Sequence, residues 1–111
     1  ETDTEAVQER NLERIIVQKW IAIFPLGVEA WSEHRRTGYP KLLPVPTDKS
    51  GGSVNVEQGA RRLPYPVEEY QQNNANLQAA IQTLGAEQQN GDRSGDVMGT
   101  RVWWDCKPYN K

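Results

Sequence analysis

Hydrophobic residues in the N-terminal part of the chain recur at the spacing of one face of an α-helix. They are Val7, Leu12, Ile15, Ile16, Trp20 and Ile23. Ahead of them, Thr2 and Glu5 stand at the spacing of a capping box, a pattern with which many helices begin. The sequence therefore predicts a helix over about residues 4–24.

The second half of this predicted helix is hydrophobic on most of its sides. Within residues 15–24, Val17 and Ile21 lie off the main stripe. A helix that is apolar all round needs neighbours on more than one face, because water is a poor solvent for every side of it. We therefore expect Trp20 to face a core that it shares with Trp31. Since this chain can hardly cover the whole segment by itself, we also expect exposed apolar surface over residues 15–24, or self-association.

A second helix is predicted directly after the first. Pro25 ends the first helix, since the residue before a proline is pushed out of the helical region, and Gly27 gives the chain freedom to turn. The second helix should then cover residues 28–37. Gly38 suits the position just after a helix end, and Pro40 prevents the helix from continuing. Two helices joined by a short turn form a helical hairpin.

Two loops and one further helix are predicted in the rest of the chain. Residues 44–60 and 85–99 are rich in glycine and polar residues, which is typical of loops. Between them, Pro66 can begin a short helical turn that runs through Tyr70. A helix over residues 73–84 is indicated by apolar residues at helical spacing, namely Leu77, Ala80, Ile81 and Leu84.

The C-terminal segment Arg101–Asp105 has the β-branched and aromatic content of a short strand. Side chains alternate along a strand, so the adjacent Trp103 and Trp104 should point to opposite faces. The predicted fold is therefore mainly α: a helical hairpin with long ordered loops and a short C-terminal strand.

Composition and charge narrow the classes of function. Leu, Ile, Val and Phe make up about a fifth of the residues, which is a thin supply for a hydrophobic core. The net charge is −2 and the basic residues are scattered rather than gathered in a stripe, so we expect no nucleic-acid partner. The lone Cys106 excludes a disulfide within the chain, and we interpret it as an unpaired thiol.

The charged run in the second predicted helix has a structural interpretation. Glu33, His34, Arg35 and Arg36 could suggest acid–base chemistry or an anion site. However, Glu33 and Arg36 stand at the i, i+3 spacing of an ordinary helix pair. We therefore interpret the run as structural.

No residue pattern indicates catalysis or a metal site. A glycosidase needs two carboxylates facing each other across a cleft, whereas Glu68 and Glu69 diverge on a helical turn and Asp92 and Asp96 stand in a predicted loop. The chain's one His and one Cys are far apart and lack metal-ligand spacing. We expect the chain not to be an enzyme and to hold no metal or cofactor.

Three blocks of the sequence resemble a known family. Residues 13–24 running into 29–43, then 61–70, then 101–105 look like the C-terminal region of the SusD/RagB outer-membrane lipoproteins. The resemblance implies a scaffold of tetratricopeptide-like helical hairpins with a loop-rich region, and a lipid anchor at the mature N-terminus. It also implies that the protein captures oligosaccharide above a TonB-dependent transporter, without catalysing a reaction.

The resemblance also implies partners and a location. Residues 1–111 are expected to be a single C-terminal fragment of such a protein. The missing N-terminal part and a TonB-dependent transporter would be its protein partners, at the cell surface of the outer membrane. An alternative class of function is a docking module that contacts one of these partners and no sugar.

An oligosaccharide site combines an aromatic face, which stacks on the sugar ring, with polar groups that bind the hydroxyls. The candidate glycan-binding residues in this chain are Trp103, Trp104, Arg101, Asp105 and Tyr39. The competing interpretation is that these large aromatic side chains simply supply the core of a protein with few aliphatic residues.

Overall fold

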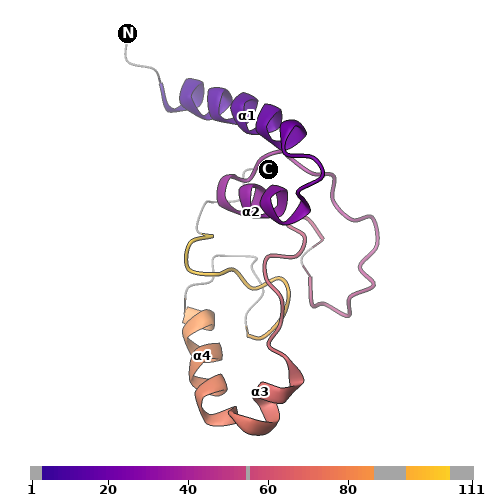
Figure 1. Cartoon of the computed structure of the whole chain (residues 1–111), viewed down its shortest axis with the longest axis vertical. Coiled ribbons are helices and arrows are strands. Elements are labelled where there is room, and N and C mark those ends of the chain that lie inside the picture. Colours follow the sequence, from indigo (N-terminus) through magenta and orange to yellow (C-terminus); the bar gives the residue numbers. More distant parts are fainter. Residues whose placement is uncertain (1–3, 55, 87–94, 106–111) are drawn as a thin grey trace. The chain divides into compact units, whose positions relative to one another are not determined.

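The computed structural model of the chain describes residues 4–54, 56–86 and 95–105. The chain is divided into two compact units, which separate between Leu42 and Leu43. The first unit holds helices α1 (Glu5–Ala22) and α2 (Gly27–Thr37), and the second holds α3 (Val67–Gln72) and α4 (Asn74–Ala86) (Figure 1). The mainly α prediction is confirmed, since the described residues hold these helices and no β-strand. None of the described helices is both long and apolar enough to cross a bilayer.

The first helix follows the apolar periodicity of its sequence. Its ends suit the helix dipole, with Glu5 in the first turn and Lys19 in the last. The predicted capping box involves Thr2, which lies outside the described residues. At the N-terminus of the helix, the backbone amides of Val7 and Gln8 donate to the carbonyl of Thr4 at 2.8 and 3.1 Å.

The chain turns sharply between α1 and α2, as Pro25 and Gly27 predict. The amide of Leu26 donates to the carbonyl of Ile23 at 2.7 Å, and the amide of Gly27 donates to the carbonyl of Pro25 at 2.8 Å. At the other end of α2, Gly38 has a left-handed φ of 77° and its amide donates to the His34 carbonyl at 2.8 Å. The predicted helical hairpin is therefore confirmed, together with its glycine C-cap.

Polar side chains tie the two helices of this hairpin together. Lys19 of α1 lies 3.0 Å from the Glu33 carboxylate of α2, which also pairs with Arg36 at 2.7 Å. The hydroxyl of Tyr39 donates to the carboxylate of Glu9 at 2.7 Å. Because hydrogen bonds to Arg36 and Lys19 outweigh burial, the pKa of Glu33 is lowered. The charged run in α2 thus joins helices, in keeping with its structural interpretation.

The expected burial of Trp20 is wrong within the chain itself, whereas the exposed apolar surface expected over residues 15–24 is observed. Ile16 is the buried residue of this helix, whereas Trp20 is 40% exposed and Phe24 is 86% exposed. The prediction failed because periodicity shows which faces need cover but not whether the cover comes from the same chain.

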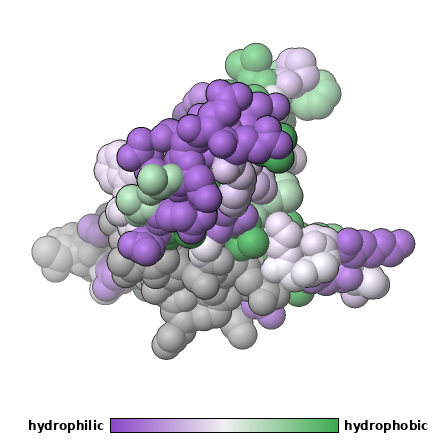
Figure 2. Space-filling model, turned by 90° about the horizontal axis from the view of Figure 1, so that it is seen from below, coloured by the Kyte–Doolittle hydropathy of each residue, from purple (hydrophilic) through white to green (hydrophobic). Residues whose placement is uncertain are grey.

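The second unit begins with a long irregular segment, as residues 44–60 predict. Within this segment the Val45 amide donates to the Val56 carbonyl at 3.0 Å. Pro66 stands at the N-cap position of α3. This helix contacts α4, in which Leu77 is buried. Figure 2 shows that the described surface nearest the viewer in that view is mainly hydrophilic. The predicted loop over 85–99 is described only in part, since 87–94 lie outside the described residues.

Candidate functional site

The candidate site lies in the second unit, where two segments far apart in sequence run together. The backbone amides of Arg61 and Arg62 both donate to the carbonyl of Met98, at 2.7 and 3.2 Å. The amide of Gly99 donates to the Ser53 carbonyl at 2.7 Å. These bonds give the irregular backbone internal partners, which a segment without helix or strand otherwise lacks.

A buried ion-pair cluster joins the two segments more strongly. We call Asp105, Arg61 and Arg101 the Asp105 cluster; all three side chains are buried. The guanidinium of Arg61 faces the Asp105 carboxylate with two nitrogens, Nε at 2.9 Å from Oδ2 and Nη2 at 3.0 Å from Oδ1. Arg101 Nη1 lies 3.8 Å from the same carboxylate and 3.4 Å from the Asp105 carbonyl oxygen. The contact from Arg61 Nη2 is a hydrogen bond, and the close ion pairing holds Asp105 in place, since buried charges are tolerated only when paired.

A second carboxylate holds the start of the same segment. We call Asp96, Arg62, Tyr65 and Tyr70 the Asp96 cluster. Asp96 accepts hydrogen bonds from Arg62, from the hydroxyl of Tyr70, and from the Tyr65 amide at 3.0 Å. Arg62 also lies over the Tyr65 ring, 4.7 Å from its centre. Burial alone would raise the pKa of Asp96, but these three donors together lower it below its usual value.

The two clusters position a turn that carries both C-terminal tryptophans. The amide of Asp105 donates to the carbonyl of Val102 at 2.9 Å, so Trp103 and Trp104 are the central residues of a tight turn. The predicted C-terminal strand is therefore wrong. A single local hydrogen bond closes this segment, and an extended pair would need a partner strand, which the described residues do not provide.

The turn nevertheless separates the two indoles by exposure. Trp103 is 77% exposed, whereas Trp104 is partly buried. An exposed indole held on an anchored turn can stack on a flat apolar face, such as one side of a sugar ring.

The other predicted site residues are not placed beside this indole as exposed polar groups. Arg101 and Asp105 are buried in the Asp105 cluster, so their side chains are occupied by each other and by Arg61. Tyr39 belongs to the first unit and is buried; burial, followed by the hydrogen bond to Glu9, raises its pKa to about 12. The glycan-binding role of Trp103 stays a prediction.

Sequence reasoning missed the residues that anchor the turn. Arg62 and Asp96 are separated by 34 positions, and Arg61 and Asp105 by 44, so no spacing rule connects them. Asp96 had the appearance of a loop residue. The available signal was indirect: two adjacent arginines in a proline-rich segment that has few aliphatic residues to bury.

Cys106 and Asp92 lie outside the described residues, so neither enters the site. Within the described part of the chain, no three His, Cys, Asp or Glu side chains gather as metal ligands would. What the described site offers is therefore an exposed aromatic surface backed by buried ion pairs.

Comparison with known proteins places this geometry in a family. A family model described as "Susd and RagB outer membrane lipoprotein" matches residues 1–105. A crystal structure of a SusD homologue from Bacteroides thetaiotaomicron is 58% identical, with a TM-score of 0.80 over 94% of this chain and 21% of that one. A SusD homologue from Bacteroides ovatus is 56% identical, with a TM-score of 0.78 over 89% of this chain and 20% of that one.

One similar structure is named for its ligand. It is a chitin-binding SusD homologue from Flavobacterium johnsoniae, 46% identical, with a TM-score of 0.74 over 93% of this chain and 20% of that one. The chain thus spans about a fifth of the length of the solved structures that it matches. No curated protein matches the chain.

Proposed function

Because this chain belongs to the SusD and RagB family of outer membrane lipoproteins, we propose that it is the C-terminal portion of a cell-surface protein that captures oligosaccharide. In this proposal the full-length protein is lipid-anchored in the outer membrane and passes its ligand to a TonB-dependent transporter. It binds glycan and does not cleave it. The relative named as chitin-binding, at 46% identity, supports a glycan as the ligand class.

The observation that carries a sugar-binding role for this portion is the exposure of Trp103. Its indole is 77% exposed, although large aromatic side chains are usually buried at least in part. Its turn is closed by Asp105, whose carboxylate is paired with Arg61. A ring that is presented on a fixed turn loses little freedom when a ligand stacks on it.

A second candidate function is a docking module that touches no sugar. The exposed apolar residues at the end of α1, among them Phe24 at 86% exposure, favour it. The two functions involve different units, so they are separable by substitution. A glycan-binding role depends on Trp103, whereas a docking role depends on the end of α1.

The first test is the replacement of Trp103 by alanine in the full-length protein that carries these residues. A glycan microarray identifies a ligand, and calorimetric titration then compares parent and variant. The free energy of glycan binding should become weaker by about 1–3 kcal/mol in the variant, which is the scale of aromatic stacking on a flat ligand face. The melting temperature should hardly change, because an exposed ring contributes little to the core.

Two further variants make this result specific. Trp103→Phe keeps an aromatic face and should retain most of the affinity. Trp104→Ala removes a partly buried ring and should lower the melting temperature instead. Unchanged affinity in Trp103→Ala would show that this indole takes no part in binding, and release of reducing sugar would refute the non-catalytic assignment.

A further inference from the structure

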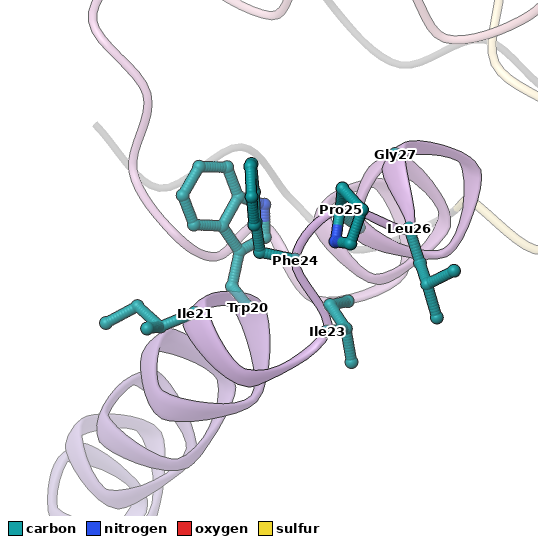
Figure 3. A pocket seen from close by; sticks show the side chains of 8 residues that line it. Trp20, Ile21, Ile23, Phe24, Pro25, Leu26 and Gly27 are labelled. Carbon is teal, nitrogen blue, oxygen red and sulfur yellow. The ribbon is translucent and has the colours of Figure 1, made fainter.

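The end of the α1–α2 hairpin carries an apolar surface that no described part of its own unit covers. We call this surface the hairpin face; Figure 3 shows Trp20 and Phe24 projecting side by side from the end of α1, with Ile21 and Leu26 directed away on either side. The exposed fractions are 60% for Ile21, 86% for Phe24 and 60% for Leu26. Contiguous apolar surface of this kind marks a site of interaction rather than a solvated face.

The hairpin face is hollowed as well as apolar. It encloses a volume of about 430 Å³ lined by Trp20, Ile21, Ile23, Phe24, Pro25, Leu26, Gly27 and Ala30. The lining offers hydrocarbon and aromatic surface and almost no polar groups. A sugar placed there would lose hydrogen bonds to water without replacement, so the hollow suits apolar side chains.

The need for cover extends along α1 beyond the hollow. Ile15 is 65% exposed, and Ile16 is the buried residue of this 18-residue helix. Helices in proteins owe most of their stability to the packing of an apolar face rather than to intrinsic propensity. The occupant therefore has to supply a continuous apolar layer, as a packed helix does, rather than one inserted side chain.

The polar groups of the hairpin point to the same kind of occupant. Lys19 pairs with Glu29 and Glu33, and Glu33 pairs with Arg36, within the hairpin itself. Because these charged groups pair with one another inside the hairpin, they need no charged group from the occupant. The contact that the exposed end of α1 still needs is apolar. Helical hairpins that expose one apolar side stack on further helices in repeat-like arrays.

We propose that the hairpin face is the packing surface for an apolar helix from the preceding part of the same SusD-like polypeptide. The solved relatives are about five times as long as the stretch they share with this chain, since they are covered to 20–21%. That length of polypeptide is ample to supply the missing layer, and it is present at high effective concentration because it is covalently joined. The inference rests on the proposed function only in treating the chain as part of a full-length family member.

Thiol labelling of single cysteines tests this assignment. In a Cys106→Ser background, Ile21→Cys and Trp103→Cys are each prepared in this 111-residue chain and in the full-length protein, and their rates of maleimide labelling are measured. Ile21→Cys should label rapidly in the 111-residue chain and at least roughly tenfold more slowly in the full-length monomer, because labelling must then wait for local opening. Trp103→Cys is the matched control and should label rapidly in both.

Each other outcome overturns the assignment. Rapid labelling of Ile21→Cys in the full-length protein means that nothing covers the face. Slow labelling in the 111-residue chain means that the chain covers itself. Slow labelling that appears only as concentration rises identifies a second copy, and slow labelling that requires phosphatidylethanolamine vesicles identifies a lipid surface. Glycan titration of the same Ile21→Cys protein reports separately on the proposed function.

Discussion

At the scale of single residues, paired charges provide much of the interior of this chain. Among the described residues, three hydrophobic side chains are buried, against ten polar or charged ones. Apolar area alone therefore cannot hold these segments in place. The Asp96 and Asp105 clusters do so instead, since a buried carboxylate that finds its arginine fixes the position of both.

Asp96 offers the clearest test of this view. Asp96→Asn removes the negative charge of the carboxylate to which Arg62, the Tyr70 hydroxyl and the Tyr65 amide all donate. The buried guanidinium of Arg62 is then left without its carboxylate. The free energy of unfolding at pH 7 should fall by roughly 3 kcal/mol, as for other broken buried pairs. Urea unfolding of parent and variant measures this difference.

The pH dependence of that difference follows from the lowered pKa of Asp96. A carboxyl whose pKa is lower in the folded state stabilises the fold above its unfolded pKa, about 3.9 for aspartate, and loses that contribution as the pH falls through the folded value. The parent should therefore exceed Asp96→Asn by a constant amount from pH 7 to about 5, with the gap closing below about 4. A gap that is the same at pH 3 and pH 7 would assign the effect to packing rather than to charge.

At the scale of elements, local chemistry determined most of what could be predicted. The predicted 28–37 helix is observed as Gly27–Thr37, because a proline before it and a glycine after it act through backbone sterics alone. The same holds for the predicted 73–84 helix, observed as Asn74–Ala86. Such signals depend on neighbouring residues, so they are readable without the rest of the fold.

The glycine after α2 gives an element-scale prediction with a built-in control. Gly38 adopts a left-handed φ of 77°, which an alanine adopts only under strain, so Gly38→Ala should cost about 1 kcal/mol of unfolding free energy. Gly27 begins the same helix, with no left-handed φ and open space where a Cβ would stand. Gly27→Ala should therefore leave stability unchanged or slightly higher. Thermal melts of the two variants under one buffer condition make the comparison, and equal losses would show that φ at Gly38 is not the cause.

Long-range pairing is what the sequence could not reveal. The strand expected at Arg101–Asp105 was inferred from composition, but a strand exists only with a partner, and this segment instead closes a turn. Trp20 was expected to be buried because its helix is apolar on most sides, yet the chain leaves it 40% exposed. Both errors come from contacts that depend on residues elsewhere in the fold.

At the scale of the whole molecule, the chain consists of two compact units. It spans about a fifth of the length of its solved relatives. Each unit has its own buried residues: Ile16 and Tyr39 in the first, Leu77 in the second. The apolar residues at the end of α1 belong to neither group. Their contribution to the free energy of unfolding should therefore differ between the 111-residue chain and the full-length protein.

That dependence yields a prediction in which one substitution has two outcomes. In the 111-residue chain, Phe24 is 86% exposed, so Phe24→Ala should change the unfolding free energy by no more than about 0.5 kcal/mol. In the full-length protein, where we infer that the ring is packed against another helix, the same change should cost about 3–5 kcal/mol, the range for a deleted buried phenylalanine. Ile16→Ala is the control, since Ile16 is 4% exposed in the chain itself and its loss should destabilise both proteins. Chemical denaturation of the three sequences in both lengths supplies the comparison. Equal small effects of Phe24→Ala in both would mean that the ring remains in water in the full-length protein, and the hairpin face would then have to serve a partner outside that polypeptide.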